Sequence, residues 1–262
     1  MFIGFLNSIG DKTIKIFLSM YKAVEFTLIC LIHMFNPRSY TSEVRTVLTK
    51  QIYHTSIGML PLFMFLAIFF GTIFIGVIIY LATLYNLEDN IGSIIVIFAI
   101  KEFSPFFVAL LIVFRSSATI NAEIAIMKIN KEIQMLKESK VDLIDYLYLP
   151  RILSGVVSVT ALSTLFVLIM LLGGYLFTLF YMNMDFHTYK NILISAIGFE
   201  DFAVLILKAA AFGFVIMIIP VYNGLKVGTS FETIPRSMIK GMVKIFIAIF
   251  FVEVFSLLIQ SI

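Results

Sequence analysis

The sequence predicts an all-α membrane protein that crosses the bilayer five times. Of its 262 residues, 61% are hydrophobic and only 13% are charged, and the mean hydropathy is +1.05. Soluble domains are nearer half apolar and a quarter charged. No charged residue occurs between Lys50 and Glu88 or between Arg151 and Asp185. Each of these gaps exceeds the roughly 20 residues that a spanning helix needs.

Five apolar stretches are long enough to span a membrane. They lie at about 55–84, 93–115, 152–182, 202–222 and 241–260. The first stretch contains glycines and a proline, which favour a kinked or tilted helix and leave a re-entrant hairpin open as an alternative. These residues are Gly58, Pro61, Gly71 and Gly76.

The first forty residues have a different pattern, because polar side chains recur every three or four positions among apolar ones. The polar positions are Lys12, Lys15, Ser19, Lys22 and Glu25. A basic amphipathic helix of this kind is typical of the membrane interface, and a sixth span is the alternative. Asn36-Pro37 should end the helix. We therefore divide the chain into an interfacial helix with its connector (1–50) and a membrane domain (51–262).

The lysines and arginines determine the expected orientation. If the N-terminus is cytoplasmic, all 19 of these residues fall in cytoplasmic segments except Lys101, Lys190 and Lys208. By the positive-inside rule, the five spans then place the C-terminus outside the cytoplasm. A polar connector is expected at 183–200.

Four charged residues interrupt the predicted spans: Lys101, Glu102, Lys208 and Glu253. A charge at a helix centre costs roughly 2.5–3.5 kcal/mol on the insertion scale, so such residues usually face a bundle interior or a wet cavity. Lys101 lies near a span end, from which its side chain could snorkel to the interface. For Glu102, Lys208 and Glu253 we favour a polar cavity, with mutual pairing as the structural alternative.

The longest cytoplasmic loop, from Arg115 to Arg151, contains a short amphipathic pattern. Ile129, Ile133 and Leu136 share helical spacing. Charged residues surround them at Lys128, Lys131, Glu132, Lys137 and Glu138. The pattern fits a membrane-skimming connector and a docking helix for a cytoplasmic partner equally well.

Several kinds of chemistry find no support in the sequence. There is no phosphate-binding loop motif and no H-E-x-x-H motif. The three histidines are scattered, and Cys30 is the single cysteine, so we expect no metal, cofactor or disulfide. The net charge of +3 gives no reason to expect nucleic acid. We accordingly expect no enzymatic activity in this chain.

Two motifs between residues 101 and 155 resemble a known family. Residues 101–105 read Lys-Glu-Phe-Ser-Pro and are similar to the Arg-Glu-Leu-Gly-Pro motif of the MlaE family of ABC-transporter permeases. Residues 115–127 read Arg-Ser-Ser-Ala-Thr-Ile-Asn-Ala-Glu-Ile-Ala-Ile-Met and resemble the family's Arg-x-Gly-Ser-Ala-x-x-Ala-Glu-Ile-Gly-x-Met. Lys208 and Glu253 match a lysine and an acidic residue of the family's last two spans. Lys101 stands where the family has arginine, which would replace a bidentate phosphate contact by a point charge.

The resemblance implies a function and a set of partners. Members are homodimeric permeases that pair with a cytoplasmic ATPase and an extracytoplasmic MCE-domain lipid carrier, often with a STAS-domain protein. They move phospholipid between the inner and outer membranes of double-membrane bacteria. The segment around Lys128, Lys131, Glu132, Ile133 and Leu136 would receive the ATPase's motion, and Phe70 and Phe74 would contact acyl chains. A secondary transporter that uses the intramembrane carboxylates as proton sites is the alternative, and a structural scaffold is a third.

Overall fold

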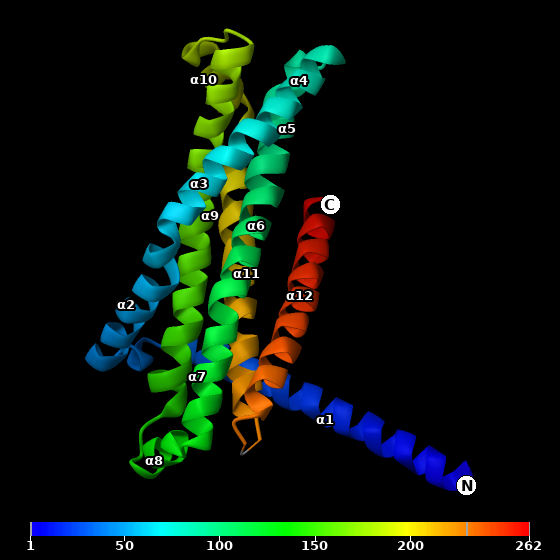
Figure 1. The fold of residues 1–262 in the computed structure, drawn as a ribbon, viewed down its shortest axis with the longest axis vertical. Coiled ribbons are helices and arrows are strands. Elements are labelled where there is room, and N and C mark those ends of the chain that lie inside the picture. The colour runs from blue at the N-terminus through cyan, green and yellow to red at the C-terminus, as the bar shows by residue number, and fades with distance from the viewer. Residues whose placement is uncertain (1, 229, 262) are drawn as a thin grey trace.

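The computed structural model describes residues 2–228 and 230–261, and it contains helices and no strand within them (Figure 1). A long N-terminal helix, α1 (Phe2–Met34), precedes the bundle. Six helical runs are long and apolar enough to cross a membrane: 17–34 within α1, 42–84, 91–129, 144–181, 199–225 and 233–260. The chain is therefore a multi-pass membrane protein, and the count of five spans depends on the role of α1.

The first run of the bundle is one continuous helical path rather than a re-entrant hairpin (Figure 1). It consists of α2 (Ser42–Ser56), a 3-10 turn (Ile57–Met59), α3 (Leu60–Phe70), a π-helical turn (Gly71–Ile75) and α4 (Gly76–Leu84). The 3-10 turn contains Gly58 and the π-helical turn begins at Gly71, two of the glycines that favoured a kinked helix. A Cβ on Gly71 would collide with the backbone of Met170 on the neighbouring helix, so the glycine permits this close approach.

The remaining runs are longer than the sequence predicted. The second comprises α5 (Ile91–Ile95), a π-helical segment (Val96–Phe103), α6 (Ser104–Ile112), a π-helical turn (Val113–Ser117) and α7 (Ala118–Ile129). The third comprises a π-helical turn (Ile144–Tyr148) and α9 (Leu149–Tyr181). Two long helices, α11 (Phe199–Leu225) and α12 (Thr233–Gln260), complete the bundle.

Two short helices lie at opposite ends of the bundle (Figure 1). Helix α8 (Glu132–Glu138) follows α7, and we call its end of the bundle the basic end, because Lys128, Lys131, Lys137 and Lys226 lie there. Helix α10 (Phe186–Ala196) lies at the opposite end. Most of the predicted polar connector at 183–200 is thus helical, with Asp185 as its N-cap.

Helix α9 is the centre of the bundle and packs against α2, α3, α6 and α11. Its contact with α11 depends on two glycines. A Cβ on Gly155 would lie 2.8 Å from the carbonyl oxygen of Gly213, so the two backbones approach closely. A buried hydroxyl joins α9 to α6, since Ser104 Oγ on α6 donates to Ser163 O on α9 at 2.8 Å. Small residues and hydroxyl hydrogen bonds are the usual basis of helix association in a bilayer.

Helix α1 runs across the direction of the other long helices, and its N-terminal half extends away from the bundle (Figure 1). It contacts the bundle through a stripe that includes Ala23, Phe26, Thr27 and Cys30. The helix ends at Met34, as Asn36-Pro37 predicted. The side chains of Lys12 and Lys15 lie outside the described part of the structure.

The glycine contact between α9 and α11 leads to a test of the fold. Gly155→Val should force the two helices apart and lower the free energy of unfolding by about 1–3 kcal/mol, the usual cost of overpacking. Thermal unfolding in detergent measures this loss. Gly228→Val is the control, because a Cβ there would make only ordinary contacts of about 3.8 Å with Thr233. Equal loss in both variants would contradict the packing argument.

Candidate functional site: a buried charge cluster

Lys208, Glu102 and Glu253, three of the charges that interrupt the predicted spans, meet in the bundle. Lys208 on α11 is only 4% exposed. Its ammonium forms ion pairs with Glu102 and with Glu253, whose Oε1 lies 2.9 Å away on α12. The same ammonium donates to the Lys101 carbonyl oxygen at 3.1 Å. We call Lys208, Glu102 and Glu253 the charge cluster.

The charge cluster has polar neighbours that the sequence reasoning missed. Lys101 Nζ lies 2.7 Å from Asp201 Oδ1 in the first turn of α11, so Lys101 forms an ion pair instead of snorkelling to the interface. Asp201 also accepts from the Gly198 N–H at 2.7 Å and so caps α11. Gln260 Nε2 donates to Glu102 Oε1 at 3.1 Å. Asp201 and Gln260 lie at the ends of their helices, where polar residues carry no signal of burial.

The composition of the cluster leaves one acceptor free. A single ammonium faces two carboxylates, and Glu253 Oε2 is buried without a hydrogen-bond partner among the described residues. Breaking a buried ion pair by removing one partner typically costs 3–5 kcal/mol, because the remaining charge is uncompensated. Lys208 is thus the group on which two carboxylates depend.

The depth of the cluster follows from helix geometry. Glu102 and Arg115 lie on one continuous helical run, 13 positions apart, which is about 20 Å at 1.5 Å per residue. Arg115 ends the charge-free part of this run toward the basic end. Because the hydrocarbon core is about 30 Å thick, a helix with Arg115 near one boundary carries Glu102 beyond the midplane.

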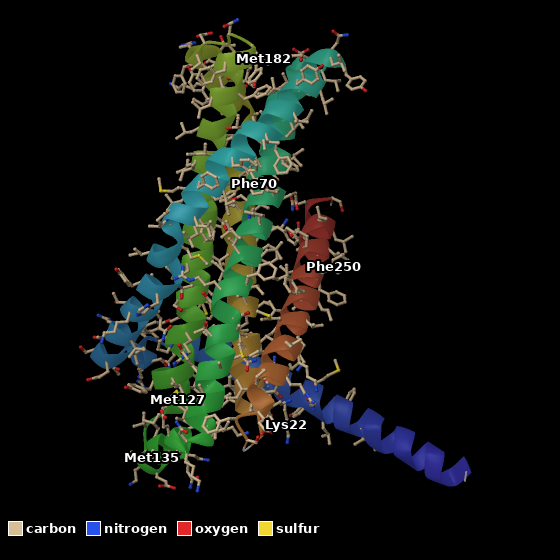
Figure 2. All side chains as sticks on the ribbon, in the orientation of Figure 1. Lys22, Phe70, Met127, Met135, Met182 and Phe250 are labelled. Atoms are coloured by element: carbon tan, nitrogen blue, oxygen red, sulfur yellow. The ribbon has the colours of Figure 1, made fainter. Side chains whose placement is uncertain are left out.

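An aromatic cluster packs beside Glu102. Phe70 and Phe74 stack on each other with ring centroids 5.4 Å apart. Phe74 lies 5.0 Å from Phe103, and Phe70 lies 4.7 Å from Phe107. Both predicted acyl-contact residues are therefore half-buried against the run that carries Glu102 (Phe70 is labelled in Figure 2).

An apolar groove adjoins the charge cluster between α11 and α12. It has a volume of about 190 Å³. Its walls are Val204, Leu207, Ala211, Val252, Phe255 and Ile259, with Lys208, Ser256 and Gln260 as the polar lining. A narrow apolar surface with a charged group at one side suits an acyl chain next to a polar head.

The predicted docking segment is divided between two helices. Lys128 belongs to the end of α7, where its ammonium donates to the carbonyl oxygens of Leu225 and Val227 at 2.8 and 2.6 Å. Lys131 takes a left-handed conformation (φ 62°) and separates α7 from α8. Helix α8 then carries Glu132, with Ile133 and Leu136 half-buried.

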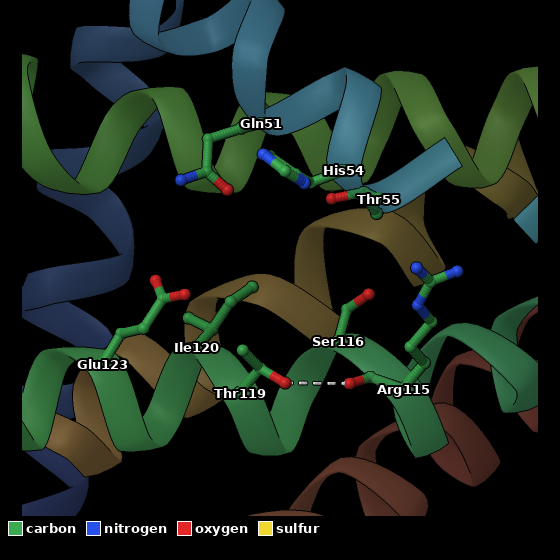
Figure 3. Close-up of a pocket in the computed structure, with 8 residues that line it drawn as sticks. All are labelled: Gln51, His54, Thr55, Arg115, Ser116, Thr119, Ile120 and Glu123. Carbon is green, nitrogen blue, oxygen red and sulfur yellow. Dashed lines mark hydrogen bonds between the residues drawn. The ribbon is translucent and has the colours of Figure 1, made fainter. Parts of the chain in front are cut away.

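A second, more polar pocket of about 360 Å³ opens between α2 and the run that carries Arg115 (Figure 3). Gln51, His54 and Thr55 face Arg115, Ser116, Thr119, Ile120 and Glu123 across it. Glu123 also pairs with Arg151, at 3.2 Å. The pocket is therefore lined by both a cation, Arg115, and a carboxylate, Glu123.

One histidine lies near acidic groups. His33 at the end of α1 has its Nδ1 2.7 Å from Asp145 Oδ1, and ligand atoms of His33, Asp142 and Asp145 all lie within 4.8 Å of one another. Asp142 already accepts from the Ile144 N–H at 2.8 Å. The contact of His33 with Asp145 links the end of α1 to the start of the run that contains α9. The sequence did not predict this link.

The fold defines a polytopic helical membrane protein with paired charges inside its bundle, and comparison with known proteins gives the family. Residues 48–259 match the family model described as Permease MlaE. The chain belongs to the MlaE permease family. It is therefore an ABC-transporter permease subunit and not itself an enzyme, and a permease of this class works with a separate ATPase.

Individual relatives agree with this assignment. A probable ABC transporter permease protein of Rickettsia bellii is 25% identical over 248 residues, which cover 93% of this chain and 92% of the relative. The intermembrane phospholipid transport system permease protein MlaE of Haemophilus influenzae is 24% identical over 226 residues, covering 86% and 85%. A probable ABC transporter permease protein of Pyropia yezoensis is 26% identical over 210 residues, covering 79% and 78%.

Removing the central ammonium tests the charge cluster. Lys208→Met should destabilise the protein by about 3–5 kcal/mol, because it leaves Glu102 and Glu253 unpaired. The triple change Lys208→Met, Glu102→Gln and Glu253→Gln should recover most of that loss. Thermal unfolding in detergent measures both, with Lys190→Met on exposed α10 as the control. A triple variant less stable than Lys208→Met would refute the pairing.

Proposed function

We propose that this chain is the permease subunit of an ABC-type transporter that moves phospholipid between the inner and outer membranes of a double-membrane bacterium. The observation that carries the proposal is the charge cluster beside an apolar groove, in a member of the MlaE family. A phospholipid needs both surfaces, one for its charged head and one for its chains. A relative named as an intermembrane phospholipid permease supports this substrate.

The proposed topology places the basic end in the cytoplasm and the C-terminus in the periplasm. The positive-inside rule supports it, since Lys128, Lys131 and Lys137 gather at that end. Residues 1–50 then form an interfacial helix with its connector, and 51–262 form the permease domain. The crosswise direction of α1 supports its interfacial position (Figure 1), which leaves five spans.

The proposed residues have separate roles. Glu102, Lys208 and Glu253 form the polar side of the lipid path, Lys101 fixes the start of α11 through Asp201, and Phe70 and Phe74 contact acyl chains. Helix α8 with the adjoining Lys128 and Lys131 is the coupling element. The proposed partners are a second copy of this chain, a cytoplasmic ATPase, an extracytoplasmic MCE-domain lipid carrier and a STAS-domain protein.

The proposal is tested by isolating the tagged chain from its native membrane. We expect the ATPase, an MCE-domain protein and bound phospholipid to co-purify, and phospholipid transfer by the reconstituted complex to require ATP hydrolysis. Transfer that continues without ATP would support a proton-coupled secondary transporter, for which the unpartnered Glu253 Oε2 would be the proton site. Absence of both partners and lipid would sink the proposal.

The coupling role of α8 has its own test. Met135 is 54% exposed on α8 at the basic end (Figure 2), so Met135→Glu should leave the fold intact and weaken ATPase association at least tenfold. Co-purification and thermal unfolding measure the two effects. Tyr85→Glu is the matched control, because Tyr85 is 67% exposed and follows α4 at the opposite end. Equal ATPase binding by both variants would contradict the role of α8.

A further inference from the structure

A cavity of about 270 Å³ lies where α1 crosses α11 and α12, at the basic end. It is separate from the charge cluster, since Lys208 and Lys226 are 18 positions apart on the same helical path, about 27 Å. Three elements line it: Ser19, Met20, Ala23 and Thr27 from α1, Ile218, Ile219, Tyr222, Asn223 and Lys226 from α11 and its C-cap, and Lys244 from α12. We call it the interface pocket.

The polar lining of the interface pocket consists of two ammonium groups held in place. Lys226 Nζ donates to Ser19 Oγ at 2.8 Å and lies 4.1 Å from the centroid of the Tyr222 ring. Lys244 Nζ donates to Asn223 Oδ1 at 2.8 Å. Among the described residues neither lysine pairs with a carboxylate, and no acidic residue lines the pocket. The pocket therefore has two uncompensated positive charges.

Asn223 holds one of these lysines in place. The residue is only 6% exposed, and its Oδ1 accepts the hydrogen bond from Lys244 Nζ. Its Nδ2 is buried inside the protein, without a hydrogen-bond partner among the described residues, and has no accessible surface in the pocket. The two ammonium groups are therefore the donors from which a phosphate group would accept hydrogen bonds, each acting as a point charge.

The rest of the pocket wall selects a lipid rather than a soluble anion. Met20, Ala23, Ile218 and Ile219 form a mainly apolar surface that would lie along an acyl chain. The adjoining face of α1 exposes Phe17, Val24 and Leu28, which places the opening in the bilayer. Basic pockets between membrane helices on the cytoplasmic side are suited to acidic lipid head groups.

We propose that the interface pocket binds the phosphate of an anionic phospholipid of the leaflet at the basic end. The lipid bridges α1 to α11 and α12, adding to the direct contact in which Tyr222 Oη donates to the Ser19 carbonyl at 3.3 Å. The site holds a resident lipid that positions the interfacial helix. Binding of this resident lipid does not depend on whether phospholipid is the transported substrate.

Native mass spectrometry of the full-length protein in detergent, titrated with phosphatidylglycerol, tests this proposal. The wild type should retain one tightly bound lipid per chain. Lys226→Gln/Lys244→Gln should weaken its binding at least tenfold. Lys22→Gln/Lys50→Gln, which removes the same charge from exposed positions at the basic end, should leave it unchanged. Equal weakening in both double variants would overturn the proposal, because it would show only general surface charge.

Further arms separate the possible ligands and exclude a folding defect. Phosphatidylcholine should bind at least tenfold more weakly than phosphatidylglycerol, and millimolar inorganic phosphate should not displace the lipid. Displacement by inorganic phosphate would show a soluble-anion site and overturn the lipid assignment. Lys208→Met/Glu102→Gln/Glu253→Gln, which alters the charge cluster, should keep the lipid in the interface pocket.

Thermal unfolding must show that the Lys226→Gln/Lys244→Gln variant is folded. Lys226→Arg/Lys244→Arg should restore lipid binding, and failure of that rescue in a folded protein counts against the proposal.

Discussion

The ammonium of Lys208 determines how the end of the bundle opposite the basic end is assembled. Inside a membrane, an isolated charge is costly, so Lys208 requires carboxylates, and it takes them from two other helical runs. The position of helix α12 depends most on these ion pairs. Much of its surface is exposed, including Phe250, Phe251 and Phe255, and Phe250 lies on the side away from the bundle (Figure 2). Glu253 and Gln260 are the polar contacts that hold its C-terminal half against the other runs. In a bilayer, where apolar burial between helices gives no net drive, such contacts determine where a helix is placed.

The centre of the bundle is held by a different kind of contact. There α9 meets α3 and α11 at glycines, so backbones approach more closely than larger side chains would allow. The π-helical turns fall within the first three runs, and one of them, Val96–Phe103, carries Lys101 and Glu102. A π-turn changes the direction in which successive side chains point. Within this segment the adjacent residues Lys101 and Glu102 pair with two positions of α11, Asp201 and Lys208.

The apolar pattern of the sequence predicts the spans because the bilayer requires long uncharged helices, and the cost of intramembrane charge predicts that Glu102, Lys208 and Glu253 share an interior site. The structure has these spans as long helical runs, and it pairs the three charges with one another, which is the alternative to the polar cavity that the sequence favoured. The structure differs where the apolar pattern gives no prediction. Helix α7 extends to Ile129, beyond the predicted end of the span at 115, because a helix can continue outside the membrane without an apolar face. Asp201 and Gln260 were missed since polar residues at helix ends are ordinarily solvated. The interface pocket could not be predicted, because Ser19, Asn223 and Lys244 meet only after α1 has folded across the bundle.

The position of α1 connects the basic end to the rest of the molecule. One part of the helix forms a wall of the interface pocket through Ser19 and Ala23, and its end is linked to the α9 run by the contact of His33 with Asp145. Asp145 lies seven positions after Glu138, the last residue of α8. A displacement of α8 therefore acts first on the short segment that also holds α1. Between the two ties at Ser19 and His33, Phe26 packs against Tyr148 and Tyr222. Helix α1 is therefore held both to the segment before α9 and to α11, and a displacement of one relative to the other would load these contacts.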